Sequence, residues 1–184
     1  IKNYMQRTAI QCSPNMVSAV TGTWIPGSSR NIDTIHPFKK HFEEIEIGDT
    51  VITEKRKISL EDIEAFAELS GDKFYAHMDA EAAAKNPFFD GRVAHGYLLI
   101  SAAAGLFVWP GEGPVLANTG LENLSFQKPV NPGDVIQVQF TCKQKKDRLT
   151  EVWGEVRWDT TIVNQDGEVC ANYDVLTGVA NIEK

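Results

Sequence analysis

The sequence of 184 residues has few cysteines, an odd number of them, and no long uninterrupted hydrophobic segment. Cys12, Cys142 and Cys170 show neither CxxC nor metal-ligand spacing, which argues against a disulfide framework and a zinc site. We therefore expect reduced thiols and a cytoplasmic protein. The longest apolar segment, around Gly96 to Trp109, is too short to cross a bilayer, and no signal-peptide pattern is found. No membrane partner is expected.

Positive charge is also scarce. The chain has 18 Lys and Arg against 25 Asp and Glu, a formal net charge of -7. This balance argues against a general nucleic-acid or anionic-membrane binder, because such binders use extended basic surfaces. It does not exclude a local basic pocket for a phosphorylated ligand.

Two parts of the chain differ in pattern. Residues 1–38 are interrupted by Ser13-Pro14, by Pro26 to Ser29 and by His36-Pro37, which predicts a tail or linker. Residues 39–184 have regular periodicity and a length typical of one domain. We therefore predict a single folded domain that follows an N-terminal extension.

The periodicity within this domain predicts an α+β fold. A helix is expected from Leu60 to Gly71, a short one from Ala80 to Lys85, and an apolar helix, buried on most sides, from Gly96 to Val108. Alternating apolar residues predict strands elsewhere, over 50–58, 115–126, 138–142, 152–162 and 169–179. Long antiparallel strands that follow one buried helix suggest a sheet wrapped around that helix.

The segment that follows the first helix carries the chemistry. Asp72 and His77 are five residues apart and would point away from each other on an α-helix, so they can converge on one water only from a turn. A carboxylate and an imidazole together can hold and deprotonate a water. Gly96 begins the apolar helix, where its N–H can donate to a carbonyl oxygen. The pattern predicts addition of water beside a carbonyl group.

Each of these residues also has a purely structural interpretation. Asp72 can cap a turn while His77 packs on the surface, and Gly96 can simply allow close packing. His95 is a candidate oxyanion or substrate-binding residue, and it can also be a helix-entry residue whose ring is satisfied by the backbone. Ser101 can donate to a carbonyl of the preceding helical turn.

Three sequence blocks resemble the MaoC-like hydratases of the hotdog superfamily, which include (R)-specific enoyl-CoA hydratases. They are Ser70 to His77, the His95-Gly96 helix start with Ser101, and Phe126 to Asp134. The resemblance covers about residues 42 to 180. It implies a hotdog fold, an acyl-CoA thioester substrate, a homodimer or larger oligomer, and no metal or cofactor. It also implies roles for side chains: Asp72 as the base for water, His77 as its holder, with roles open to exchange, and Ser101 at the site.

One departure from the family pattern points to a narrower group. The typical Asn-Pro is replaced by Phe74-Tyr75. This variant resembles the hydratase-like domains that are fused to an aldehyde dehydrogenase in bacterial phenylacetate degradation and open the ring of oxepin-CoA. Residues 1–38 resemble the end of that dehydrogenase domain and its linker. The resemblance implies covalent fusion to an upstream dehydrogenase, and a pocket that Phe74 and Tyr75 shape for a ring.

Several alternatives stay open at this point. Lys85, Arg92 and Lys128 are candidates for contacts with the phosphates of coenzyme A, and equally for ordinary solvated charges. The reaction can be ring opening or hydration of a linear 2-enoyl-CoA. An acyl-CoA thioesterase is disfavoured, because the apolar helix from Gly96 to Val108 carries no carboxylate. A domain that only assembles dehydrogenase subunits is the non-enzymatic alternative.

Overall fold

The computed structural model describes residues 35–148 and 152–182, so most of the predicted N-terminal extension and the thiol of Cys12 lie outside the described residues. Pro37 and Phe38 begin the described domain in a short 3-10 helix, η2, over Pro37–Lys39, and both are buried. A second, η3, covers Phe42–Glu44. The folded domain therefore begins before the predicted boundary between residues 38 and 39.

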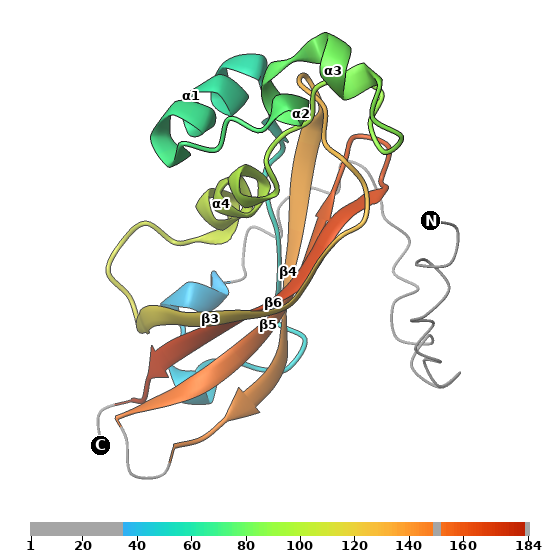
Figure 1. The fold of residues 1–184 in the computed structure, drawn as a ribbon. Coiled ribbons are helices and arrows are strands. Elements are labelled where there is room, and N and C mark those ends of the chain that lie inside the picture. Colours follow the sequence, from blue (N-terminus) through green and yellow to red (C-terminus); the bar gives the residue numbers. More distant parts are fainter. Residues whose placement is uncertain (1–34, 149–151, 183–184) are drawn as a thin grey trace, which may run out of the picture. The chain divides into compact units, whose positions relative to one another are not determined.

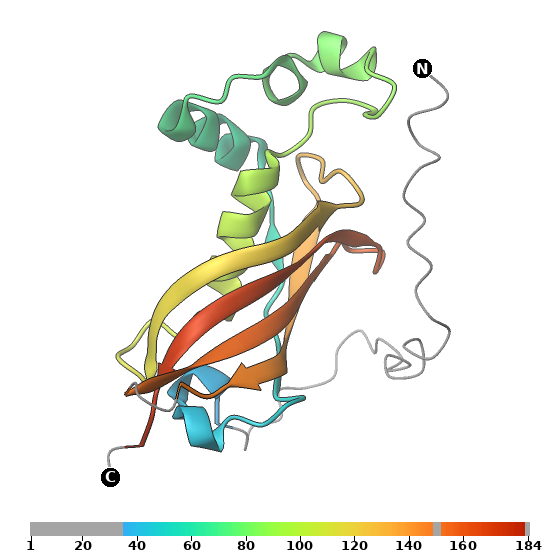
Figure 2. The ribbon, with the colours of Figure 1, turned by 60° about the horizontal axis from the view of Figure 1, so that its bottom comes forward.

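The predicted α+β hotdog architecture is confirmed. Six strands form an antiparallel sheet in the order β1-β4-β5-β6-β3, with β2 also paired to β4. Figures 1 and 2 show the sheet as a curved layer with one long helix, α4, against one face. The strands are β1 Thr50–Ile52, β2 Arg56–Lys57, β3 Val115–Phe126, β4 Val135–Lys146, β5 Trp153–Val163 and β6 Val169–Ala180.

The strand predicted over residues 50–58 is interrupted between β1 and β2. The hydroxyl of Thr53 accepts the N–H of Val138 at 3.0 Å and donates to the carbonyl of Glu54 at 2.8 Å. A side chain thus takes over a main-chain hydrogen bond of the ladder. Alternation of apolar residues does not reveal such a substitution.

The helices are α1 Leu60–Ser70, α2 Tyr75–Met78, α3 Ala80–Ala84 and α4 Gly96–Phe107. The first three gather at the end of the sheet where α4 begins (Figure 1). Helix α4 is less enclosed than predicted, because Tyr97, Ser101 and Gly105 form an exposed stripe along it. Among the described residues, no helix is long and apolar enough to cross a membrane.

The C-terminal end of α4 packs on the centre of the core. The rings of Phe107 and Phe140 stack with centroids 4.2 Å apart, and Phe140 stacks on Trp158 at 4.7 Å. Phe38 meets this cluster edge-on, 5.4 Å from the ring of Phe140. The incoming chain is therefore anchored at the C-terminal end of α4.

Candidate active site

Helix α1 ends in a way that sets the position of Asp72. The helix begins with a capping box, in which Ser59 and Asp62 each accept the other's main-chain N–H. It ends at Gly71, whose φ of 79° is left-handed and favours glycine. Asp72 follows in an exposed loop, where one carboxylate oxygen accepts the N–H of Phe74 at 3.2 Å.

His77 lies on the short helix α2 and is half-buried. Its Nδ1 is 2.7 Å from the carbonyl oxygen of Val93. A carbonyl only accepts, so Nδ1 carries the hydrogen and the neutral ring has a free lone pair at Nε2. Burial lowers the pKa of His77, and His95 lowers it further, against opposing effects of the Val93 carbonyl and Asp72. The imidazole is therefore neutral at pH 7 and able to accept a proton.

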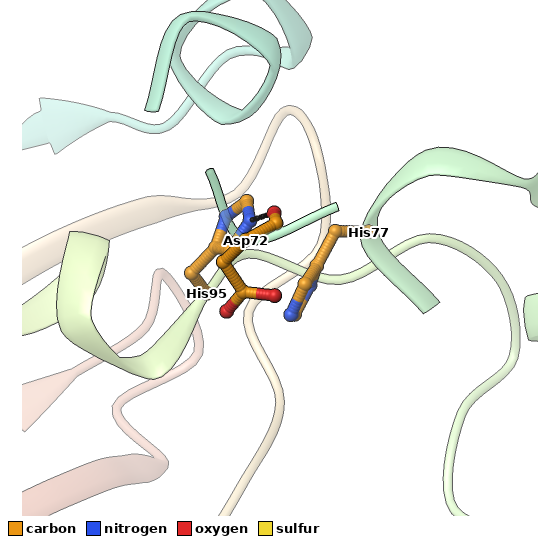
Figure 3. Close-up of side chains that lie close together, drawn as sticks. All are labelled: Asp72, His77 and His95. Carbon is orange, nitrogen blue, oxygen red and sulfur yellow. Dashed lines mark hydrogen bonds between the residues drawn. The ribbon is translucent and has the colours of Figure 1, made fainter. Parts of the chain in front are cut away.

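The structure brings together the two residues that the sequence placed five apart. Asp72, His77 and His95 each offer a side-chain atom, and these atoms all lie within 4.8 Å of one another. Figure 3 shows the carboxylate of Asp72 beside the ring of His77. The expected convergence arises because Asp72 is in a loop and His77 is on a new helix. A water between the two side chains can hydrogen-bond to both.

His95 lies behind this pair. Its side chain is buried, with 1% of the residue exposed, and its Nε2 donates to the main-chain carbonyl of Asp72 at 2.9 Å (Figure 3). Its ring stacks on that of His77, with centroids 3.8 Å apart and 29° between the planes. The Nδ1 atom has no hydrogen-bond partner among the residues that the structure describes. The backbone thus satisfies the Nε2 of His95, as the structural interpretation expected, but it does not satisfy Nδ1.

Helix α4 begins at the site. No side chain caps its first turn, so its main-chain N–H groups are available to an oxygen atom from outside the helix. The ring of Phe126, at the end of β3, lies against Gly96: a Cβ added there would be 2.5 Å from Cζ of that ring. A side chain at this position would displace the Phe126 ring, which is about half exposed, so close packing favours glycine here, in line with one of the two interpretations. The packing is compatible with the other, an N–H that binds a thioester oxygen.

The remaining predicted site residues lie around this centre. Phe74 and Tyr75 are about half exposed, with ring centroids 4.5 Å apart, and the ring of Phe74 is 5.8 Å from that of His77. The ring of Phe74 therefore lies beside the imidazole, and the ring of Tyr75 packs against Phe74. Ser101 is on the exposed stripe of α4 and donates to the carbonyl of Tyr97 at 2.8 Å. Its contact is the one expected of a structural serine.

Two of the three phosphate candidates are already engaged in ion pairs. Arg92 donates to Glu64 at 3.3 Å, and Lys128 is paired with Glu168. Hydrogen bonding to Glu168 raises the pKa of Lys128. Lys85 is exposed at the end of α3. The role of these side chains toward a phosphate stays a prediction.

The histidine geometry does not suit a metal ion, although Asp72, His77 and His95 lie close together. A metal binds an imidazole nitrogen at about 2.0–2.1 Å and close to the plane of the ring. Two rings stacked 3.8 Å apart have planes that do not meet within that reach. The cluster fits proton transfer better than metal binding.

The carbonyl of Val93, which fixes the ring of His77, is one of the contacts that the sequence does not reveal. No local pattern marks it, because a main-chain acceptor sixteen residues away can have any side chain. Phe126 belonged to a motif of the resemblance, but nothing in the sequence indicated that its ring lies on Gly96.

Comparisons with known proteins show which proteins the chain is similar to. Residues 42–164 match the profile of a family described as "MaoC like domain". A Klebsiella aerogenes protein named "Protein MaoC" is 52% identical over 169 residues, which cover 88% of this chain and 50% of that protein. A "3-hydroxybutyryl-CoA dehydratase" of Methylorubrum extorquens is 39% identical over 102 residues, 54% of this chain and 61% of that protein. The chain thus spans about half to three-fifths of the length of these curated relatives.

A solved structure is similar in fold as well. The unliganded "R-Hydratase PhaJ1 from Pseudomonas aeruginosa" is 32% identical, with a TM-score of 0.60 over 77% of this chain and 86% of that one.

Proposed function

Since the chain belongs to the MaoC-like domain family, we propose that it adds water to the C2=C3 double bond of a 2-enoyl-CoA thioester and catalyses the reverse dehydration. The observation that carries the proposal is the convergence of Asp72 and His77 beside the uncapped start of α4. The names of two relatives, a 3-hydroxybutyryl-CoA dehydratase and an R-hydratase, support the same reaction class.

The hydrogen bonds around His77 suggest how the proton moves. Because Nδ1 is held by the Val93 carbonyl, Nε2 is the atom that takes a proton from the water as its oxygen attacks C3. The imidazolium then returns that proton to C2, so that water adds in full. The Asp72 carboxylate accepts a hydrogen bond from the O–H that stays on the attacking oxygen, and it stabilises the imidazolium. The resemblance favoured Asp72 as the base and left an exchange of roles open; the tautomer of His77 favours the exchange.

The thioester oxygen gains negative charge while water adds. We place it against the N–H of Gly96, where the helix dipole and an N–H donor stabilise an enolate oxygen. An uncapped first turn of α4 is the feature that supports this placement.

For the substrate, we propose a cyclic enoyl-CoA, oxepin-CoA, whose C3 carries the ring oxygen. Water addition at C3 gives a hemiketal. Its collapse converts C3 to a ketone, breaks the bond from C3 to the ring oxygen and leaves that oxygen as an enol, which takes a proton on carbon to become an aldehyde at the other end of the opened chain. The support is the Phe74-Tyr75 pair in place of Asn-Pro, with the ring of Phe74 beside His77 and that of Tyr75 packed on Phe74. Hydration of a linear 2-enoyl-CoA is the second candidate, which the names of the relatives favour.

Residues 1–38 support a proposal about the whole polypeptide, an upstream aldehyde dehydrogenase domain. The match to the Klebsiella protein covers 88% of the chain, more than residues 39–184 contain, so it includes part of this segment. That relative has as much sequence again outside the match. Sequencing the coding region ahead of Ile1 tests the proposal, and a stop codon or an unrelated domain there would contradict it.

We also propose a homodimer, joined along the outer edge of β3. This strand ends the sheet and exposes apolar side chains, among them Leu116, Leu121 and Leu124. An unpaired strand edge with exposed apolar residues is a template for pairing with a second copy. Light scattering should give twice the monomer mass, and a Leu121→Lys variant should be monomeric.

The experiment that tests the reaction is turnover of oxepin-CoA and crotonyl-CoA by the wild-type chain and its Asp72→Asn variant. A strong preference for the cyclic substrate, lost in the variant, supports ring opening. Comparable or faster hydration of crotonyl-CoA supports the linear substrate. No turnover of either by the folded dimer contradicts the proposed reaction and favours an assembly role.

A Phe74→Ala variant tests the substrate proposal separately. If the aromatic pair shapes the pocket for a ring, the ratio of kcat/KM for oxepin-CoA to that for crotonyl-CoA falls. A variant with an unchanged ratio removes this explanation of the Phe74-Tyr75 pair.

A further inference from the structure

We propose that His95 is a positioning residue, which holds the main chain of Asp72 and the ring plane of His77 so that both side chains meet at one water. The proposal rests on the reaction proposed above and assigns its second histidine a separate task. His95 itself does not touch the substrate, because only 1% of it is exposed.

The first contact that carries the proposal is the hydrogen bond to Asp72. The loop after α1 is otherwise held by short-range bonds: the N–H of Asp72 donates to Ser70, and that of Phe74 to Asp72 itself. Both bonds join residues two apart, so they shape the turn without fixing it on the rest of the domain. The bond from Nε2 of His95 joins residues 23 apart and ties the loop to the start of α4.

The second contact is the stack of the two imidazoles. His77 can rotate about its side-chain bonds unless something fixes both an edge and a face of its ring. The Val93 carbonyl fixes the edge at Nδ1, and the ring of His95 covers one face at 3.8 Å. Segment 93–95 therefore orients both members of the proposed catalytic pair. A displacement of about 1 Å between reacting groups can cost about 10²-fold in rate.

The hydrogen bond to Asp72 also fixes the tautomer of His95. Its Nε2 carries a hydrogen because the Asp72 carbonyl only accepts. The other ring nitrogen, Nδ1, is buried without a hydrogen-bond partner among the described residues. The ring also lies against Phe66, with centroids 5.1 Å apart, a contact that restricts its rotation.

Two substitutions separate the hydrogen bond from the ring. His95→Phe keeps an aromatic ring but has no donor, whereas His95→Gln keeps an N–H that can reach Asp72 and has no ring. His41→Gln is the matched control, since the His41 side chain is 43% exposed and hydrogen-bonds to Glu44 within the described structure. The measurements are thermal unfolding, kcat and KM for each variant with the better of the two CoA substrates, and the pH dependence of kcat/KM.

We expect His95→Phe to lower kcat by about 10–100-fold, with KM changed less than about twofold. His95→Gln should recover most of this loss, and His41→Gln should behave as the wild type. Removal of the His95 imidazole should also shift the acidic limb of the kcat/KM profile to higher pH, because that ring helps to lower the pKa of His77. A residue with only a role in folding would lower the amount of folded protein and leave the pH limb unmoved.

The proposal is overturned if folded His95→Phe keeps more than half of the wild-type kcat, or if His95→Gln loses as much as His95→Phe. Imidazole nitrogen NMR of the wild-type chain gives a readout that requires neither activity nor a folded variant. It should show hydrogen on Nε2 of His95 and on Nδ1 of His77; the opposite tautomer of His95 overturns the proposal. Correct tautomers in a chain that turns over neither substrate would contradict the proposed reaction instead.

Discussion

The two ends of α4 each carry a pair of stacked rings, with opposite consequences. At the C-terminal end, Phe107 and Phe140 stack at 4.2 Å with 10° between their planes. At the N-terminal end, His77 and His95 stack at 3.8 Å with 29° between theirs. The first pair is apolar and buried. The second pair carries four ring nitrogens, and each of them either donates a hydrogen bond or has a lone pair that can accept a proton.

Similar packing therefore stabilises the domain at one end and prepares chemistry at the other. Burial of the phenyl rings is favourable because it removes apolar area from water. Burial of imidazole disfavours its charged form, which is the main reason for the lowered pKa of His77. The apolar stack of Phe107 on Phe140 stabilises the C-terminal end of α4. This stability holds in place the stacked imidazoles at the N-terminal end, whose burial is less favourable.

The largest expected effect comes from substitutions that disrupt only the candidate site at the N-terminal end of α4. Asp72→Asn and His77→Gln should each lower kcat by about 10²–10⁴-fold, as expected for loss of a group that moves or orients the reacting proton. The double variant should be little worse than either single one, because both groups act on the same water. Steady-state kinetics measure this, with circular dichroism as the control for folding. Multiplicative losses would mean that the two residues act independently.

The next largest effect comes from a substitution that disrupts only the aromatic stack at the C-terminal end of α4. Phe140→Ala should lower the free energy of unfolding by about 3–5 kcal/mol, because it empties a closely packed ring stack. Urea titration measures the change. The fraction that remains folded should keep the wild-type KM, since Phe140 lies at the far end of α4. A raised KM in folded protein would show that the two ends are not independent.

A pH titration sharpens the comparison without a substitution. The pKa of His77 is lowered from the ordinary value of 6.5, so Nε2 stays free to accept a proton below that pH. As the pH falls through the lowered pKa, kcat/KM should decline about tenfold per unit. The unfolded chain binds this proton at a higher pH than the folded one, so His77 should also reduce stability as the pH falls below 6.5. An acidic limb above pH 6.5 would contradict the burial argument.

The smallest expected effect concerns the link between α1 and the catalytic loop. Gly71→Ala forces a side chain into a left-handed backbone, at a cost of about 1 kcal/mol in the free energy of unfolding. A Cβ at this position would meet no atom within 4 Å, so the cost is conformational rather than steric. Relaxation of the strain should move Asp72 and lower kcat more than it changes KM. Ser59→Ala is the control, because it weakens the other end of α1 by a similar amount.

Local features were readable from the sequence. The helix expected from Leu60 to Gly71 is α1, Leu60–Ser70, with Gly71 as its C-cap, and the strand 115–126 matches β3 at both ends. The close approach of Asp72 and His77 followed from a turn between them. Each of these inferences depends on residues within a few positions of one another.

What the sequence did not reveal depends on long-range contacts. The ring of His95 contacts residues 18 and 23 positions earlier, and nothing at His95 itself distinguishes a buried positioning residue from a substrate ligand. The pairing of Lys128 with Glu168 joins residues 40 positions apart. The exposed stripe on α4 was missed because hydrophobic composition alone does not show which side of a helix faces away from a sheet.

The anchoring of Phe38 has a mechanical consequence for this domain. The chain enters beside Phe107 and Phe140, whereas the side chains of the candidate site lie at the other end of a twelve-residue helix, about 18 Å away. A force that pulls on the incoming chain therefore acts first on the ring of Phe38, which is packed in the core. Tension from a segment ahead of residue 35 would have to pull the Phe38 ring out of the core before it could displace Asp72 and His77.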